Sequence, residues 1–175
     1  MTAPLLEIAN LTVRFGDFAA VDGASFAIEK GETLALVGES GSGKSLTALS
    51  ILQLAPPSAV YGENSSIRFQ GEELVAAAEK KLRAIRGDRI AMIFQEPMTS
   101  LNPLHTIERQ VNETLILHKG LSAAQARART LELLNLVGIP NAEQRLGAYP
   151  HELSGGQRQR VMIAMALANE PDLLI

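Results

Sequence analysis

The segment GESGSGKS, residues 38–45, has the residue types and the spacing of a phosphate-binding loop, G-x-x-x-x-G-K-[ST]. Glycines allow the backbone to approach a phosphate closely and to point successive N–H groups at its oxygens. A lysine in this position supplies a cation for the β- and γ-phosphates, and the next hydroxyl can ligate Mg²⁺. We therefore expect a nucleoside triphosphate to bind at Gly38, Glu39, Ser40, Gly41, Ser42, Gly43, Lys44 and Ser45.

The elements on both sides of this loop fit the same interpretation. The run TLALVG, residues 33–38, is almost continuously apolar and predicts a central strand buried on both faces. A helix is predicted from Lys44 to about Leu54, ended by two prolines at 56 and 57. The positive end of its dipole would then lie at the phosphates. A chance glycine-rich turn would not bring this strand–loop–helix context with it.

A second glycine motif, LSGGQ, covers residues 153–157. Taken alone it predicts only a helix start, because Ser154 and Gln157 have the spacing of a capping box. A helix N-terminus with open backbone amides and a serine hydroxyl can nevertheless bind an anion. The motif follows the phosphate loop by about 110 residues and comes after a helix-rich segment.

The segment YPHELSGGQRQRVMIAMALANEPDLLI, with the phosphate loop before it, resembles the signature region of ATP-binding-cassette (ABC) ATPases, and the likeness extends over essentially the whole chain. The segment IAMIFQEPMTSLNP, residues 90–103, is similar to the ATPase subunits of bacterial oligopeptide and dipeptide importers. This resemblance implies an α/β fold of the P-loop NTPase, ABC-ATPase type, with an antiparallel β subdomain and an α-helical subdomain. It also implies ATP and Mg²⁺ as ligands.

The resemblance further implies roles for single residues. Phe15, with Phe18 as the weaker candidate, would lie against the adenine ring, although each is more simply a core residue. Gln95 would contact Mg²⁺ and the attacking water and act in catalysis with Lys44; its alternative role is a polar residue at a strand end. ATP would lie between two chains of a head-to-tail dimer, with its γ-phosphate facing Ser154, Gly155, Gly156 and Gln157 of the other subunit.

The function implied is that of an ATP-hydrolysing subunit that energises the import of peptides or similar solutes. Its partners would be a second ABC ATPase domain, integral membrane permease subunits and, indirectly, a solute-binding protein, at the cytoplasmic face of the bacterial inner membrane. In the family, the region corresponding to residues 98–117 forms the groove that receives a coupling helix of the membrane subunit. Two alternatives stay open: a non-transport ABC ATPase that acts on DNA or ribosomes, and a nucleotide-binding chain without hydrolysis.

Composition limits the other possibilities. A net charge of −3 and an aromatic content of 4% do not favour a nucleic-acid partner. The chain has no cysteine, which excludes disulfides and thiolate metal sites, and the spacing of its three histidines does not predict a metal site. The longest apolar run, residues 161–168, is far shorter than the roughly 20 residues that span a bilayer. Membrane association would therefore come through a partner.

The remaining pattern predicts a β-rich first part and a helical second part. Strands are expected at 5–15, 20–31, 65–71 and 89–94 and at Leu173, and helices at 76–87, 106–119, 122–137 and 157–168. We divide the chain into a nucleotide-binding β/α core to about residue 95, a helical subdomain to about 160, and a return to the core over 161–175. In the resembling family the strand begun by DLLI runs into an Asp and a Glu needed for hydrolysis. We therefore expect a C-terminally truncated fragment that is nearly inactive in ATP turnover.

Overall fold

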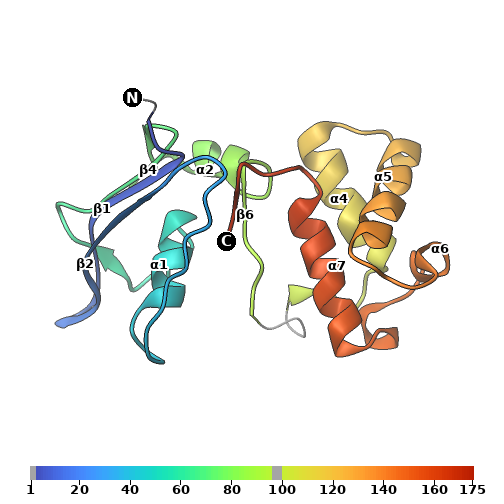
Figure 1. Ribbon diagram of the computed structural model, residues 1–175, viewed down its shortest axis with the longest axis horizontal. Helices are drawn as coiled ribbons and strands as arrows, with labels where there is room; N and C mark the ends of the chain where they lie inside the picture. The colour runs from blue at the N-terminus through green and yellow to red at the C-terminus, as the bar shows by residue number, and fades with distance from the viewer. Residues whose placement is uncertain (1–2, 96–99) are drawn as a thin grey trace. The chain divides into compact units, whose positions relative to one another are not determined.

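The computed structural model describes residues 3–95 and 100–175 (Figure 1). Its internal contacts divide the chain into two units, residues 1–83 and 84–175. Helix α2 (Glu79–Ile85) contains the division between them. The subdomain boundaries expected near residues 95 and 160 stay a prediction. No helix in the described part of the chain is both long and apolar enough to cross a bilayer.

The first unit is built on an antiparallel sheet whose strands follow the order β2-β1-β4-β5, with β3 also paired to β1. Three of the predicted strands are confirmed, and two further short ones join them. The strands are β1 (Leu6–Phe15), β2 (Phe18–Ile28), β3 (Val60–Tyr61), β4 (Ser66–Phe69) and β5 (Glu72–Glu73). Each of these strands pairs with at least one other through its backbone, so the sheet forms within this unit.

Strand β1 keeps one face in the core by means of a bulge. Leu6 and Ile8 are buried on one side of the bulge, and Leu11 and Val13 on the other. The pairing with β2 shifts register between Ile8 and Leu11, and Asn10 in between has a left-handed φ of 50°. Because side chains alternate along a strand, one extra residue is needed to return the apolar positions to the same face. The uneven 6, 8, 11, 13 spacing of the sequence is thereby explained.

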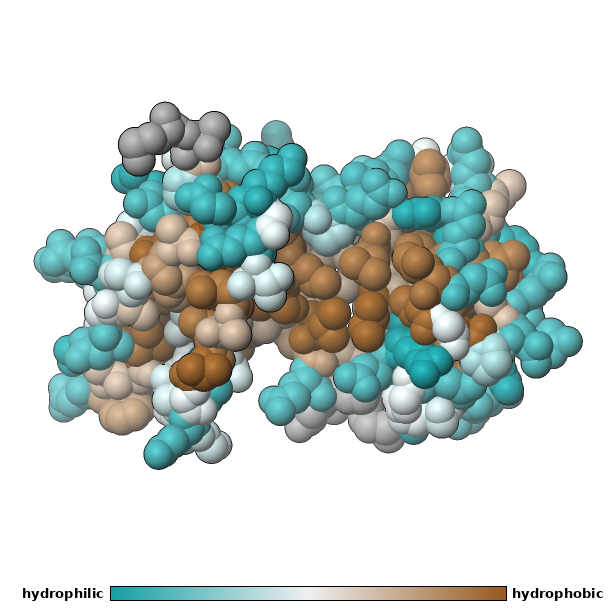
Figure 2. Space-filling model, in the orientation of Figure 1, coloured by the Kyte–Doolittle hydropathy of each residue, from teal (hydrophilic) through white to brown (hydrophobic). Residues whose placement is uncertain are grey.

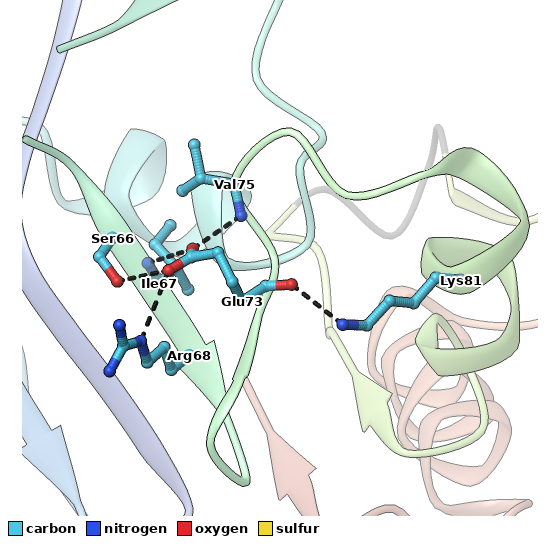
Figure 3. A network of polar contacts seen from close by, with 6 residues as sticks. All are labelled: Ser66, Ile67, Arg68, Glu73, Val75 and Lys81. Atoms are coloured by element: carbon cyan, nitrogen blue, oxygen red, sulfur yellow. Dashed lines mark hydrogen bonds and ion pairs between the residues drawn. The ribbon is translucent and has the colours of Figure 1, made fainter. Parts of the chain in front are cut away.

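The carboxylate of Glu73 stabilises the turn between β4 and β5 through hydrogen bonds (Figure 3). Glu73 accepts hydrogen bonds from the Ser66 hydroxyl (2.5 Å) and from the backbone N–H groups of Ile67 (2.9 Å) and Val75 (3.0 Å). Burial by itself raises the pKa of Glu73, but the hydrogen bonds from Ser66 and the backbone outweigh it and hold the pKa below its usual value of 4.5. The ionised side chain therefore stabilises this hairpin.

The predicted central strand over residues 33–38 is wrong. Residues 33–38 have no assigned secondary structure, and Leu34, Leu36 and Val37 are 39%, 42% and 88% exposed. No strand of the described residues pairs with this run. An apolar run shows that side chains favour burial, whereas a strand also requires neighbours that satisfy its backbone N–H and C=O groups. The run therefore leads into the phosphate loop as irregular backbone.

Helix α1 (Lys44–Ile51) follows the loop, as predicted, and packs against β2. It is shorter than the predicted range, since Leu52 is its C-cap. Ile51 and Leu52 are buried, and the hydroxyl of buried Ser50 donates a hydrogen bond to the Leu46 carbonyl (2.7 Å). The apolar end of the helix is thus anchored in the first unit, while its N-terminus faces the loop.

The second unit contains a short parallel pair, β6 (Ile90–Ala91) with β7 (Leu173–Leu174). The strand predicted over 89–94 is therefore shorter than expected, and the one at Leu173 is confirmed. Backbone hydrogen bonds continue beyond the assigned strands, because Asp172 N–H donates to the Arg89 carbonyl and Ile93 N–H to the Ile175 carbonyl. This pairing joins two segments about 80 residues apart in sequence.

The rest of the second unit is a helical bundle with its own core. Its helices are α4 (Ile107–Lys119), α5 (Ala123–Leu136), α6 (Ala142–Arg145), the 3₁₀ turn η1 (Pro150–Glu152) and α7 (Gly155–Leu167). The predicted helices at 106–119 and 122–137 are confirmed, and that at 157–168 begins two residues earlier. Fully buried Ile107, Val111, Leu134 and Val161 lie in the core. Apolar surface is also visible over α7 (Figure 2).

Candidate functional site

The phosphate loop ends in a glycine that the fold requires. Gly43 is the N-cap of α1, with a left-handed φ of 84°. A Cβ added there would overlap the Ala20 carbonyl oxygen and lie 3.1 Å from Val21 Cγ2. Only glycine combines this conformation with so close an approach to β2. Since Gly43 has no side chain to accept from the first-turn N–H groups of α1, those donors face the loop.

The ammonium group of Lys44 lies inside the loop. Its Nζ donates to the carbonyl oxygens of Gly38 (2.8 Å) and Glu39 (2.6 Å) and lies 3.3 Å from Ser42 Oγ. These contacts bend the flexible side chain back over the loop that precedes it. A cation and free backbone donors at one helix end form the electrostatic arrangement that a polyphosphate requires.

A groove of about 620 Å³ runs between this loop and strand β2. Gly38, Gly41, Ser42 and Lys44 of the loop line it. Thr47 lies in the same groove, one turn beyond Lys44 on α1, and sequence reasoning missed it. The i, i+3 spacing of the two residues on a predicted helix was the signal that could have identified it.

The groove also bears on the aromatic residue expected beside adenine. Phe18 lines it and is 67% exposed. Phe15 pairs with Phe18 across the end of the β1–β2 hairpin, is half-buried, and is not among the described lining residues. The assignment of Phe15 to the adenine ring therefore stays a prediction, and Phe18, the weaker candidate, is the one that lines the groove.

The remaining residues expected to contact the nucleotide differ in their positions along the chain. Glu39, Ser40 and Ser45 are exposed, and Ser45 is the second residue of α1. Gln95 is also exposed. It directly precedes residues 96–99, which lie outside the described part of the chain. Met98, the first residue of the expected coupling groove, is one of them. Ser45 belongs to the first unit and Gln95 to the second.

The signature motif forms the N-terminus of α7. Ser154 is its N-cap and makes a reciprocal capping box with Gln157: Ser154 Oγ accepts from Gln157 N–H (3.3 Å), and Gln157 Oε1 accepts from Ser154 N–H (3.0 Å). Gly155 and Gly156 are exposed, and apart from α7's own backbone and the adjoining residues, no atom of the described residues lies within 4 Å of an added Cβ. The capping box predicted from the sequence is confirmed, and the two glycines leave the helix end open to a large anion.

A turn that sequence reasoning did not single out leads into this motif. The rings of Tyr149 and His151 stack with their centroids 5.8 Å apart. Tyr149 N–H donates to the Glu152 carboxylate (2.7 Å), which closes η1. Buried Leu153 then anchors the chain before Ser154. The start of α7 is thus held in place by its own preceding turn.

A second groove, of about 570 Å³, lies along α4 and is called the α4 groove below. Its described lining residues are Thr106, Glu108, Arg109, Asn112, Glu113, Ile116 and Leu117. Ile116 and Leu117 are 43% and 75% exposed. The loop before α4 is held by buried Gln110, whose amide bonds to Asn102 N–H (2.8 Å) and to the carbonyls of Asn102 (3.1 Å) and His105 (2.9 Å).

Comparisons with known proteins place this geometry in a wider context. A family model described as ABC transporter matches residues 21–175. The chain is 60% identical over 178 residues to the peptidoglycan transport ATP-binding protein YejF of Agrobacterium fabrum, covering 99% of this chain and 33% of the relative. It is 50% identical over 175 residues to the oligopeptide transport ATP-binding protein OppD of Bacillus subtilis, covering 98% and 49%. The chain thus spans a third to about half the length of these two relatives.

Solved structures show the same fold. A dimeric, post-hydrolysis structure of the ATP-binding cassette MJ0796, bound to ADP and Pi, superposes with a TM-score of 0.83 at 30% identity, covering 97% of this chain and 72% of that one. The cbiO1 protein from Clostridium perfringens, part of an ABC transporter complex, gives a TM-score of 0.76 at 27% identity, covering 98% and 64%. The mixed α/β cassette fold expected from the sequence is confirmed.

Proposed function

Since this chain belongs to the ABC transporter family, as its match over residues 21–175 shows, we propose that it is an ATP-binding subunit that couples ATP binding and hydrolysis to the import of peptides or similar solutes. The observation that carries the proposal is the phosphate loop, in which Lys44 is held at the start of α1. The names of the relatives, which refer to peptidoglycan and oligopeptide transport, support the class of solute.

The loop would bind the triphosphate by exchanging its internal contacts. The Lys44 ammonium would leave the carbonyls of Gly38 and Glu39 and donate to β- and γ-phosphate oxygens, while the open N–H groups of α1 donate to the same oxygens. Ser45 is exposed beside the loop and carries a hydroxyl suited to Mg²⁺. When bound, Mg²⁺ supplies charge neutralisation between the phosphates. The family resemblance assigns to Gln95 a contact with Mg²⁺ and with the attacking water, and we keep this role as part of the proposal.

The adenine ring would occupy the β2 side of the groove. We keep Phe15 as the proposed stacking residue because the family resemblance assigns it. The exposed ring of Phe18, which lines the groove, offers a second aromatic face. Loss of adenine preference in Phe15→Ala but not in Phe18→Ala would support the first assignment, and the reverse result would support the second.

The signature would act on a nucleotide held by another subunit. The open glycines and the Ser154 hydroxyl at the α7 N-terminus suit the γ-phosphate bound by the partner's loop. ATP would thereby hold together a head-to-tail dimer of ABC ATPase domains, which would open after hydrolysis. The dimeric state of the similar cassette structure supports this arrangement.

The membrane partners would dock on the second unit. The α4 groove lies within the segment that the family uses to receive a coupling helix from a permease, and Ile116 and Leu117 supply exposed apolar contacts. Through such permease subunits the chain would be held at the cytoplasmic face of the bacterial inner membrane. A solute-binding protein would act on the permeases from the other side.

The decisive experiment measures ATP affinity and turnover of the full-length protein and of Lys44→Ala. Loss of the ammonium should weaken ATP binding and reduce turnover at least about tenfold, since charged hydrogen bonds to phosphate are lost. Lys80→Ala, which removes an exposed cation on α2, is the matched control and should change neither quantity. Unchanged turnover in Lys44→Ala would refute the assigned role. Stimulation by peptide with permeases in proteoliposomes, but not by DNA or ribosomes, would separate import from the alternatives.

A further inference from the structure

Helix α4 departs from the capping pattern that the other long helices of the second unit follow. At α5, Ser122 and Gln125 form a reciprocal capping box, as Ser154 and Gln157 do at α7. At α4 the N-cap is Thr106, whose hydroxyl accepts from Arg109 N–H (3.3 Å). The side chain three residues after the N-cap is here an arginine, and a guanidinium cannot accept the return bond from the N-cap N–H.

The charge of Arg109 is also unfavourable for the helix. It lies in the first turn of α4, where the helix dipole is positive and a cation is destabilising. Glu113 follows at i+4, and an acidic residue C-terminal to a basic one is the weaker orientation for a pair on a helix. Among residues 3–95 and 100–175, neither side chain has an ion pair, whereas neighbouring Glu108 pairs with Arg127 (3.0 Å). Helix stability therefore does not explain these two charges.

Both charges lie on the surface that would meet a partner. One helical stripe of α4, with the spacing i, i+3, i+4, i+7 and i+8, consists of Arg109, Asn112, Glu113, Ile116 and Leu117, and all five line the α4 groove. The stripe begins with a cation, continues with an anion and ends with two exposed apolar side chains. Because its two unpaired charges cancel, it suits neither an anionic lipid surface nor a nucleic-acid backbone. A protein segment that carries both charges and apolar residues fits this surface.

We propose that Arg109 and Glu113 fix the direction in which a permease helix lies in the α4 groove. This inference rests on the proposed function, since it takes the permease helix as the occupant. The helix would place a carboxylate opposite Arg109, a basic side chain opposite Glu113, and apolar side chains over Ile116 and Leu117. Reversing the helix would bring like charges together, which opposes binding in the wrong direction.

The test uses the full-length protein co-expressed and purified with the permease subunits of its own transport system. Arg109→Gln completes the capping box of α4 and removes the cation, so it should raise the Tm of the isolated protein. The same change should weaken its affinity for the permeases at least about tenfold, because it leaves the permease carboxylate without a partner. A gain in stability together with a loss of binding is not expected of a purely structural residue.

A matched control and a rescue complete the design. Gln125→Arg removes the return hydrogen bond of the capping box at α5, so it should lower Tm without changing permease affinity. Arg109→Glu should lose binding and regain it when the facing permease carboxylate is replaced by arginine. Unchanged permease affinity in Arg109→Gln, or no rescue by the exchanged pair, would overturn the inference while wild-type binding leaves the proposed function in place. Failure of the wild-type protein to bind the permeases would instead overturn both.

Discussion

The substitution Gly43→Ala tests how the phosphate loop is held against the sheet, and Gly41→Ala provides its internal control. Both glycines have a left-handed φ of 84°. A Cβ at Gly41 would have no described atom within 4 Å beyond its chain neighbours, whereas one at Gly43 would overlap the Ala20 carbonyl oxygen and approach Val21. The two changes therefore share the backbone strain and differ in the steric clash alone.

The expected losses in the free energy of unfolding follow from the backbone strain and the steric clash. An alanine in the left-handed region costs about 1–2 kcal/mol, which both variants share. The clash at Gly43 adds roughly 1–3 kcal/mol, because the nearest contacted atom, the Ala20 carbonyl oxygen, belongs to strand backbone and cannot rotate away. We expect a loss in the free energy of unfolding of about 1–2 kcal/mol for Gly41→Ala and about 2–5 kcal/mol for Gly43→Ala.

Thermal unfolding and equilibrium binding of an ATP analogue measure the two consequences. For a chain of this size, each kcal/mol corresponds to a Tm change of about 2–4 °C. Gly43→Ala should also weaken nucleotide binding more than Gly41→Ala, since relief of the clash moves the N-terminus of α1 away from β2. Equal effects of the two substitutions on Tm and on binding would refute the reasoning, because they would show that the Ala20 carbonyl does not constrain the loop.

Three further predictions concern polar groups with assigned partners. Glu73→Gln should lower Tm at neutral pH, because it removes the ionised hydrogen-bond acceptor. The folded pKa of Glu73 lies below 4.5, so the difference in Tm from wild type should shrink as the pH falls below that value. A difference in Tm that does not change with pH would contradict the assignment. Ser154→Ala removes the α7 N-cap and should cost about 1 kcal/mol of stability, which Ser154→Thr should largely retain. Gln110→Leu should destabilise by about 1–3 kcal/mol and increase hydrogen exchange at the Asn102 amide, whereas unchanged exchange there would show that the loop does not depend on Gln110.

Features set by neighbouring residues could be predicted from the sequence. The capping boxes at Ser122 and Ser154 need only the chemistry of positions three apart, and both are present. Gly120, which directly follows the predicted helix over 106–119, is the C-cap of α4 with a left-handed φ of 64°. Such signals depend little on tertiary contacts, so they survive whatever surrounds them.

Features that need a distant partner could not be predicted in the same way. Residues 33–38 have the composition of a buried strand but no pairing strand among the described residues, and they stay irregular. Which aromatic residue could face a nucleotide, the expectation made for Phe15 and Phe18, depends on how the β1–β2 hairpin presents the two rings, and a motif does not specify that. The approach of Gly43 to Ala20 likewise joins two segments that no local pattern connects.

The reciprocal hydrogen bonds at the start of α7 affect how long a closed dimer would last. Ser154 and Gln157 already satisfy each other's backbone donors, so the motif is stable without a ligand. A phosphate that bound the Ser154 N–H would have to displace the Gln157 side chain, and it would gain only the difference between the old and new hydrogen bonds. Each closure would therefore release less free energy than its contacts suggest. A dimer that opens after every ATP turnover, as proposed for this chain, would benefit from such a modest gain, because tighter binding at the α7 N-terminus would slow the release of ADP and phosphate.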